Sequence, residues 1–465
     1  MKPVSLTLRT TALVLSGLAA ACSAQSNQSG ANQPGVSQSA PRPSALAAAV
    51  RAVAIPVTDQ PRSLDPLIRR AGQASFVLLG EASHGTYEFY RTRAAITQRL
   101  ISEHGFDAVV IEGDWPETQR VNRFVRTQGA DRTPEQALSG FQRFPTWMWR
   151  NTVVRDFVGW LRTTNATRKN DSKVGFYGMD LYSLAGSRQE VIRALTTLDP
   201  ALAARTRTRY ACLAAIDPSM QDTSVPAATG GPEACERNVT AVFDDVRRLT
   251  AERRRQAGAA TEALFGLEQN ARVVKNAVAY ERTAMDMFSG ASSWNVRDQH
   301  MFETVQAIRS HLGADARIVI WAHNSHLGDA RATEMGRRGE LNVGQLIRQR
   351  YGPAALLVGF TTHTGTVMAA TEWGAPGRVM QVRPSLEGSY ERLFHDTGIP
   401  NFLLDLSRGP QGLQQERLER AIGVQYLPAS ERSSHYFQTN LPRQFDMVLH
   451  FDTTRALQPL TPAPR

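Results

Sequence analysis

The chain has 465 residues, 42% of them apolar and 21% charged, so it can bury a large core as two or three average domains or as one large α/β domain with an insertion. Its formal net charge of +10 comes mainly from arginines spread along the sequence. The densest basic run, at 247–256, has the pattern of a solvated helix face, and no nucleic-acid-binding motif accompanies it. These features argue against nucleic acid as a partner.

The first 48 residues are predicted to contain an export signal followed by a flexible linker. Residues 1–22 contain Lys2 and Arg9, an apolar stretch and small residues before Cys22, which is typical of a secretory signal and too short to span a bilayer permanently. The end of this segment resembles a bacterial lipobox, so we expect Cys22 to be lipidated; simple cleavage and secretion is the alternative. Residues 23–48 have the composition of a flexible linker. The predicted location is the periplasm, or a membrane surface reached by a lipid anchor only.

Five short apolar runs, separated by helical patterns, indicate buried parallel strands. They lie at 76–79, 108–111, 174–178, 318–321 and 355–360. The sequence therefore predicts an α/β fold with a mostly parallel central sheet and flanking helices. Between about 186 and 290 the chain is rich in Ala, Arg and Glu with helical periodicity, which predicts a helical-bundle insertion that covers the crevice at the carboxyl ends of the strands.

Cys212 and Cys235 flank a turn-rich stretch inside this insertion, and Cys22 is the third cysteine of the chain. In an oxidising compartment such an isolated pair predicts a disulfide bond. Two buried free thiols are the alternative.

Polar side chains follow each predicted strand at the point where it ends. Because the carboxyl ends of parallel strands meet at one edge of the sheet, where ligands bind, we expect these side chains to share a crevice. They are Glu81 and His84 after the first run, Glu112 and Asp114 after the second, Asp180 after the third, His323 and His326 after the fourth, and Thr361, Thr362 and His363 after the fifth.

Arg93 falls in the apolar stripe of the helix that is predicted to begin near Tyr87. An unpaired buried charge is costly, so we expect an ion pair with Glu81, or with Glu112 if the first two strands are neighbours. The alternative is that the guanidinium group extends past the edge of the helix to solvent.

The sequence lacks the G-x-S-x-G, Walker, G-x-G-x-x-G and H-E-x-x-H motifs, so two mechanisms suit the remaining acids and imidazoles. In the first, His84 is oriented by a carboxylate and takes a proton from water, while His323, His326 or Arg93 stabilises the oxyanion. In the second, Glu81, His84, His323 and His326 ligate a divalent metal ion that activates the water.

Six motifs together resemble the erythromycin esterase family, in the same order and over nearly everything from about residue 50 to 455: LLGEASHGTYEFYRTR, VVIEGDW, FYGMDLYS, NVRDQHM, WAHNSHLG and GFTTHTGTV with a following Trp. The resemblance implies an α/β catalytic domain over 49–460 with a helical bundle above the site. It also implies hydrolysis of a macrolide lactone ester without a cofactor, which would make a small ester or lactone the partner and macrolide resistance a possible outcome.

The resemblance places the water-activating histidine in the GE-x-x-HG motif, at His84 beside Glu81. The family's other polar site residues match Arg93, Glu112, His323 and His326. We further expect contacts with the substrate from Asp180, Arg297, Thr362, His363 and Trp373.

Two other functions remain open. A related branch of the superfamily includes haem-binding envelope lipoproteins, so the histidines could hold haem or iron without catalysis. The second is a metal-dependent hydrolase of another ester or of a peptide. The residues of the pocket wall, rather than the polar set, decide which substrate fits.

Overall fold

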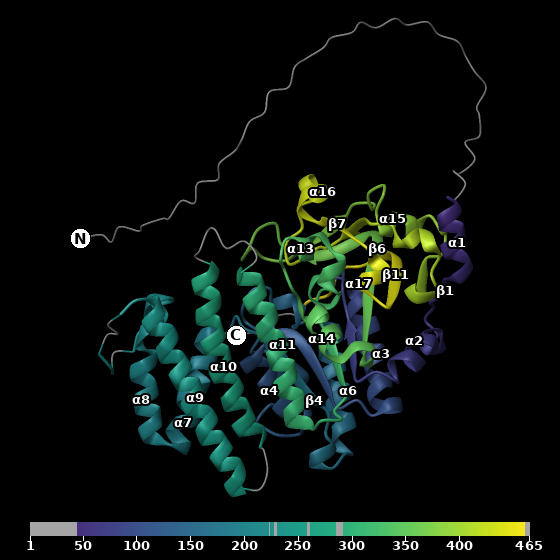
Figure 1. Cartoon of the computed structure of the whole chain (residues 1–465). Coiled ribbons are helices and arrows are strands. Elements are labelled where there is room, and N and C mark those ends of the chain that lie inside the picture. Colours follow the sequence, from purple (N-terminus) through teal and green to yellow (C-terminus); the bar gives the residue numbers. More distant parts are fainter. Residues whose placement is uncertain (1–43, 223, 227–229, 258–260, 285–291, 461–465) are drawn as a thin grey trace, which may run out of the picture. The chain divides into compact units, whose positions relative to one another are not determined.

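A nine-stranded sheet organises the fold of this computed structural model, which describes residues 44–222, 224–226, 230–257, 261–284 and 292–460 (Figure 1). Its strands are β1 (Ile55–Pro56), β2 (Phe76–Leu79), β3 (Ala108–Asp114), β4 (Gly175–Asp180), β5 (Ile318–Trp321), β6 (Ala355–Ala369), β7 (Arg378–Val382), β8 (Asn401–Asp405) and β11 (Met447–Thr454). The order is β1-β8-β11-β6-β2-β5-β3-β4, and β7 pairs with β6 outside it. The strands from β11 to β4 run parallel, whereas β1, β7 and β8 pair antiparallel with their neighbours.

Helices flank this sheet and connect most of its strands. They include α1 (Ala45–Val53), α2 (Asp65–Ala71), α3 (Tyr87–His104), α4 (Trp115–Val125), α5 (Pro134–Leu138), α6 (Thr152–Ala166), α11 (Ser292–Leu312), α12 (Asn324–Leu327), α13 (Glu334–Arg337), α14 (Val343–Tyr351), α15 (Tyr390–His395), α16 (Glu431–Ser434) and α17 (Leu441–Gln444). A separate two-stranded sheet pairs β9 (Arg417–Arg420) with β10 (Tyr436–Thr439). None of the helices in the described residues is long and apolar enough to cross a bilayer.

The apolar runs form strands that are buried on both faces. Along β2, Val77 and Leu79 belong to one hydrophobic core, while Phe76 and Leu78 belong to another, because successive side chains of a strand point to opposite faces. A sheet with a core on each face is the arrangement that covered parallel strands require. The predicted fold class, an α/β fold with a mostly parallel sheet and flanking helices, is confirmed.

The predicted helical insertion is helical in the structure. It contains α7 (Leu184–Leu198), α8 (Pro200–Tyr210), α9 (Pro232–Ala257) and α10 (Glu262–Ala284), which lie side by side around an apolar core of their own (Figure 1). A disulfide bond joins Cys212 and Cys235, so that prediction is confirmed. Near the crevice, the hydroxyl group of Tyr280 on α10 lies 3.3 Å from that of Tyr182, which follows β4.

Several predicted boundaries are wrong, and the strands expected to end at residues 111 and 178 continue to Asp114 and Asp180 as β3 and β4. The linker was expected to extend to residue 48, but α1 begins at Ala45, because Ser44 caps it by accepting from the Ala47 N–H and the alanine-rich stretch favours a helix. The strand expected at 355–360 continues to Ala369 as β6, because its later residues pair with β7 and β11. The predicted signal segment, Cys22 and residues 23–43 lie outside the described residues.

The order of the strands decides a condition that the sequence leaves open. The first two predicted strands, β2 and β3, are not neighbours, because β5 lies between them and pairs in parallel with both. The loops that follow β2, β5 and β3 are therefore adjacent at one edge of the sheet.

Candidate active site

The loop between β2 and α3 is held tightly between two other segments. A Cβ atom on Gly80 would lie 2.1 Å from Oδ1 of Asn324, and one on Gly85 would lie 1.8 Å from the carbonyl oxygen of Met368. Only glycine allows such close approaches. The Asn324 N–H also donates to the carbonyl oxygen of Glu81 at 2.8 Å. The two glycines thus allow the loop to be clamped, which fixes His84 relative to the loop that follows β5.

Glu81 bonds to both His84 and Arg93 in the interior. Its Oε1 lies 2.8 Å from Nδ1 of His84, and its Oε2 accepts from Nη2 of Arg93 at 2.7 Å. The Arg93 guanidinium is fully buried and packs over the rings of Tyr90, at 4.2 Å, and Trp321, at 5.3 Å. The prediction that Arg93 is paired with a carboxylate is confirmed, and the alternative that it reaches solvent is wrong.

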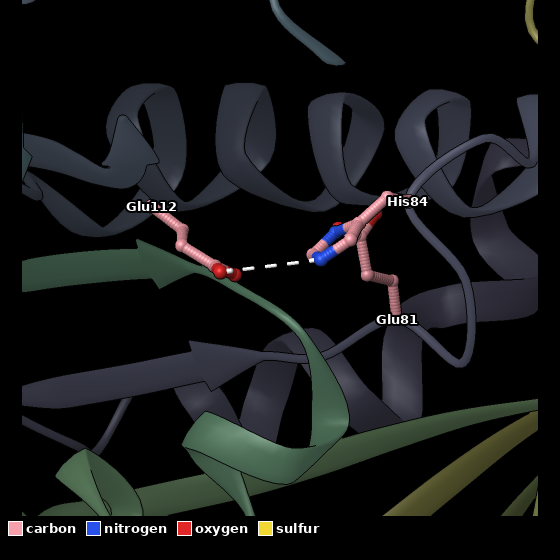
Figure 2. Close-up of side chains that lie close together, drawn as sticks. All are labelled: Glu81, His84 and Glu112. Carbon is pink, nitrogen blue, oxygen red and sulfur yellow. Dashed lines mark hydrogen bonds and ion pairs between the residues drawn. The ribbon is translucent and has the colours of Figure 1, made fainter. Parts of the chain in front are cut away.

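These contacts define the protonation of the His84 ring. A carboxylate can only accept a hydrogen bond, so the Nδ1 atom that faces Glu81 carries the proton and Nε2 of the neutral ring is an acceptor. Nε2 lies 4.0 Å from Oε1 of Glu112 (Figure 2). This separation is too long for a direct hydrogen bond and suits a bridging water molecule.

Glu112 is held by groups from two other elements. Its Oε1 accepts from Nη2 of Arg297 on α11 at 2.8 Å, and its Oε2 accepts from the backbone N–H of His323 at 2.9 Å. Burial alone would raise the pKa of the Glu112 carboxyl, but the neighbouring His326, His84 and Arg297 outweigh it and hold that pKa well below its usual range. Glu112 is therefore a carboxylate at neutral pH.

Arg297 also joins Glu112 to Asp180 at the end of β4. Its Nε and Nη2 donate to the two carboxylate oxygens of Asp180, at 2.9 and 2.7 Å. Burial opposes ionisation of Asp180, yet Arg297 lowers its pKa below the ordinary value. A bidentate pair of this kind fixes the guanidinium plane and, through it, the position of Glu112.

His323 presents an unsatisfied donor. Its Nδ1 accepts from the Ser325 N–H at 3.2 Å and lies 2.8 Å from the Ser325 hydroxyl, so the ring proton is on Nε2. Nε2 is buried and lacks a well-formed hydrogen bond in the part of the chain that the structure describes, although the Ala82 backbone interacts with the ring and opposes the fall of its pKa. Burial, together with the neighbouring His84, lowers the pKa of His323 well below its usual value, so the ring is neutral.

His326 has partners at both ring nitrogens. Its Nδ1 lies 2.9 Å from Oδ2 of Asp298, its Nε2 lies 2.8 Å from Nη1 of Arg297, and the ring stacks on Trp294 at 4.4 Å. Burial lowers the pKa of His326, but Asp298 and Glu112 outweigh burial and raise it to about 9. Asp298 fixes the ring at Nδ1 and Trp294 supports its face, so the ring is a firm wall against which Arg297 lies.

A cavity of about 450 Å³ opens onto these groups. Seven of the predicted site residues line it: His84, Glu112, Asp180, Arg297, His323, His326 and Trp373. Glu81 and Arg93 lie behind His84, where they position the ring. Tyr182, just before the helical insertion, and Trp294, just after it, also form part of the wall.

The structure does not bring Thr362 and His363 to this cavity. Both lie within β6, because the strand continues beyond its predicted end. The Thr362 hydroxyl lies 3.1 Å from that of Thr454, and Nδ1 of His363 lies 2.6 Å from the Ser385 hydroxyl. These contacts explain why the two side chains face away from the crevice.

Sequence reasoning missed several residues of the site. Asp298 follows Arg297 within the NVRDQHM motif, so the motif itself could have indicated it. Arg143 donates from Nε to Oδ2 of Asp114 at 2.8 Å, and Glu117 lines the cavity close to this pair. No spacing in the sequence connects Arg143 to Asp114, because the contact arises from the folding of a loop.

A metal ion could be held by Glu81, His84 and Glu112, whose ligand atoms lie within 4.8 Å of one another. Both carboxylates already accept hydrogen bonds at each oxygen, from Arg93 and His84 in one case and from Arg297 and His323 in the other. The predicted metal set of Glu81, His84, His323 and His326 is not gathered as such a group in the described residues.

Comparisons with known proteins agree with this arrangement. A family model described as erythromycin esterase matches residues 101–454. The chain is 22% identical to the erythromycin esterase type II of Escherichia coli over 414 residues, which is 83% of this chain and 91% of that protein.

Two solved structures show the same fold. A Bacillus cereus protein has a TM-score of 0.70 at 21% identity, covering 90% of this chain and 98% of that one. An erythromycin esterase mutant in its open conformation has a TM-score of 0.60 at 19% identity, covering 85% and 96%.

We expect Arg93→Met to lower the free energy of unfolding by about 3–5 kcal/mol, because it leaves the buried Glu81 carboxylate without its cation. Adding Glu81→Gln removes the unpaired charge and should recover part of this loss. Chemical denaturation of the single and double variants measures both effects. A single variant as stable as the wild type would contradict the buried ion pair.

A second prediction concerns pH and Glu419 on β9, which is fully buried and accepts from Nδ2 of Asn324 at 3.2 Å. Burial and the nearby Glu391 raise the pKa of Glu419 from about 4.5 to about 8. Between these values the folded protein keeps a proton that the unfolded chain releases, so this group makes stability fall as the pH rises.

Glu419→Gln should remove that decline, which amounts to about 1.4 kcal/mol per pH unit within the window. Denaturation curves from pH 4 to pH 9 provide the measurement. Glu416→Gln, at an exposed position of the same segment, is the matched control and should leave the decline in place. Parallel pH profiles for the wild type and Glu419→Gln would contradict the prediction.

Proposed function

Because the chain belongs to the erythromycin esterase family, we propose that it is a hydrolase that cleaves a carboxylic ester of the macrolactone type with water activated by His84. The observation that carries the proposal is the orientation of the His84 ring. Its protonated Nδ1 is held by Glu81, and its free Nε2 faces the carboxylate of Glu112 across 4.0 Å inside the cavity (Figure 2).

In this reaction a water molecule between Nε2 of His84 and Oε1 of Glu112 attacks the ester carbonyl carbon. His84 accepts the proton of the water at Nε2, and the Glu81 carboxylate stabilises the imidazolium ion through the Nδ1–H bond. Arg93 donates to Glu81 and holds it in place. Three contacts thus lead from Arg93 to the water: Arg93 to Glu81, Glu81 to His84, and His84 to the water.

The negative charge that develops on the carbonyl oxygen requires a donor. We assign this role to His323, because it lines the cavity and its neutral ring carries the proton on Nε2. Collapse of the tetrahedral intermediate breaks the bond between the carbonyl carbon and the alkyl oxygen. The His84 imidazolium then protonates the leaving alkoxide, which gives a carboxylic acid and an alcohol, or a hydroxy acid from a lactone.

The other charged groups act by positioning. Arg297 holds Glu112 and Asp180, and His326 with Asp298 holds Arg297. Since both oxygens of Glu81 and of Glu112 already have donors, we propose that hydrolysis proceeds without a metal ion. Trp373 and its neighbour Phe144, whose rings are 5.1 Å apart, form an apolar wall suited to a hydrophobic macrolactone.

We expect His84→Asn to lower kcat by about two to four orders of magnitude, because it removes the general base while keeping a side chain of similar polarity. Turnover is measured by incubating the protein with a panel of macrolides and simple lactones and recording by mass spectrometry the addition of one water molecule to each. His104→Asn, at the end of α3 and outside the cavity, is the matched control, and circular dichroism verifies the fold of both variants.

Three outcomes would count against this assignment. Hydrolysis by His84→Asn at a rate close to that of the wild type would remove His84 from the mechanism. Activity lost with a chelator and restored by zinc would make the acids and imidazoles metal ligands. If the purified protein hydrolyses no ester and shows a Soret band or contains stoichiometric iron, haem or iron binding would be favoured as its function.

We also propose that the protein is exported and anchored through a lipid on Cys22, as the segment at 1–22 predicts. Cys22→Ser should release the protein from the membrane fraction, and wild-type protein found entirely in the soluble fraction would contradict the anchor. An anchored hydrolase would meet macrolides as they enter the cell. Expression of the wild type, and not of His84→Asn, should then raise the macrolide concentration that the host tolerates.

A further inference from the structure

The helical insertion reaches the active site through α10, which lies beside α11 (Figure 1). Asn276 and Tyr280 are four residues apart on α10 and therefore lie on the same face of that helix. Each makes a polar contact with a residue close to Arg297, the group that holds Glu112. The insertion is thus connected by two separate routes to the acid that lies opposite His84.

The first route runs through His300 on α11, whose side chain is buried. The side-chain amide of Asn276 donates from Nδ2 to Nδ1 of His300 at 2.9 Å, so the proton of this ring is on Nε2. The backbone of Asp180 also interacts with the ring. His300 lies three residues after Arg297 on α11, so the two side chains are neighbours on that helix. His300 therefore connects α10 with the end of β4.

His300 is a neutral imidazole. Burial, followed by the charge of Arg272, lowers the pKa of His300 to about 3, although Asp180 opposes the fall. A neutral ring accepts a hydrogen bond at one nitrogen and donates at the other, so the ring can bridge Asn276 and the Asp180 backbone across the neutral pH range. A ring that stays neutral there exchanges no proton with the substrate. Its place in the molecule is that of a fixed link.

The second route runs through Tyr182, which follows β4 and lines the cavity. The hydroxyl groups of Tyr182 and Tyr280 lie 3.3 Å apart, and the two rings meet edge to face with their centroids 5.5 Å apart. The Tyr182 ring also packs against two guanidinium groups, that of Arg297 at 5.0 Å and that of Arg143 at 4.8 Å. An aromatic ring attracts cations, so the contact with Tyr280 fixes a surface against which Arg297 lies.

Both routes meet at the ion pair of Arg297 and Asp180. Arg297 donates from Nε and Nη2 to the two carboxylate oxygens of Asp180, and from Nη2 to Oε1 of Glu112. A shift of the guanidinium group therefore moves the Glu112 carboxylate, which lies 4.0 Å from Nε2 of His84. A misplacement of roughly 1 Å at a group that orients a reactant can lower a rate by about 100-fold.

We propose that Asn276 and Tyr280 of the helical insertion are positioning residues, which hold Arg297 in place and thereby fix Glu112 opposite His84. This inference rests on the proposed ester hydrolysis and gives the insertion a part in it. The face of α10 that carries the two residues sets the distance across which the attacking water is held. Neither residue lines the cavity, so neither contacts the substrate.

The test removes the two polar contacts with little change in side-chain volume. For a variant that carries both Asn276→Leu and Tyr280→Phe, we expect kcat to fall by about 10–100-fold, because Glu112 is displaced. KM should stay within about threefold of the wild type, because Glu112 orients water rather than substrate. The matched control combines Asn270→Leu on α10 with Tyr351→Phe on α14, whose contacts are with Gln119 and Gln306, and it should keep the wild-type kcat.

A double-mutant cycle with Arg297→Lys separates positioning from a general loss of folded protein. Where Arg297 is already displaced, Arg297→Lys should cost at most about one fifth of the fold-change in kcat that it costs in the wild type, whereas in the control its cost should be unchanged. His300→Gln, whose amide can still donate towards Asp180, should keep more activity than His300→Leu. Equal costs of Arg297→Lys in the variant and the wild type, or a variant kcat within about threefold of the wild type, would overturn the inference.

Crystal structures test the positioning without a substrate. In the variant with both changes, or in Tyr280→Phe alone if that variant does not fold, we expect Arg297 to leave its bidentate position on Asp180, while the control keeps it. If the wild type hydrolyses no ester and this displacement is still found, the proposed hydrolysis fails while the positioning of Glu112 by α10 stands. An Arg297 that keeps its place in the variant would overturn the inference.

Discussion

The buried chain of contacts from Arg93 through Glu81 to His84 is the interaction on which the rest of the site depends. An isolated carboxylate would be very unfavourable at a position with no solvent exposure, and the Arg93 guanidinium makes it tolerable. The ionised Glu81 in turn selects the ring tautomer of His84 and leaves Nε2 free towards the cavity. One ion pair in the interior therefore determines which atom of His84 can accept a proton.

The same loop depends on contacts that allow no Cβ atom. Gly80 faces Oδ1 of Asn324 and Gly85 faces the backbone of Met368, so the loop is held from the β5 side and from the β6 side. Asn324 also bonds to Glu419 and to the Phe360 carbonyl oxygen. The position of His84 is thus set by three segments that are far apart in the sequence, which gives the reacting group the rigid support that catalysis requires.

Where local patterns carry the signal, the sequence was sufficient to predict the site. Arg93 in an apolar stripe indicated a buried ion pair, and polar residues after apolar runs indicated Glu112, Asp180, His323 and His326 at one sheet edge. The disulfide between Cys212 and Cys235 followed from their isolation. In each case the pattern that supports the prediction lies in the sequence close to the residue concerned, and the need to pair a buried group then indicates its partner.

What the sequence does not reveal about the site has one physical cause, which is pairing between distant segments. β6 continues past residue 360 because β7 and β11 supply hydrogen bonds to its later residues, which places Thr362 and His363 inside a strand. The position of β5 between β2 and β3 is likewise a matter of the whole sheet. Arg143 reaches Asp114 from a loop, and no periodicity reports such a contact.

Strand β3 connects the two ends of the cavity. Glu112, which lies opposite Nε2 of His84, and Asp114, which lines the same cavity, are separated by Gly113 alone, and two residues of extended chain span roughly 7 Å. The register with β4 shifts between Ile111 and Asp114, so the strand is irregular where it delivers both acids. Because Arg297 holds Glu112 and Arg143 holds Asp114, each acid has its own guanidinium, and the two ends are fixed independently. One short piece of backbone therefore sets the spacing of the two acids in the cavity wall.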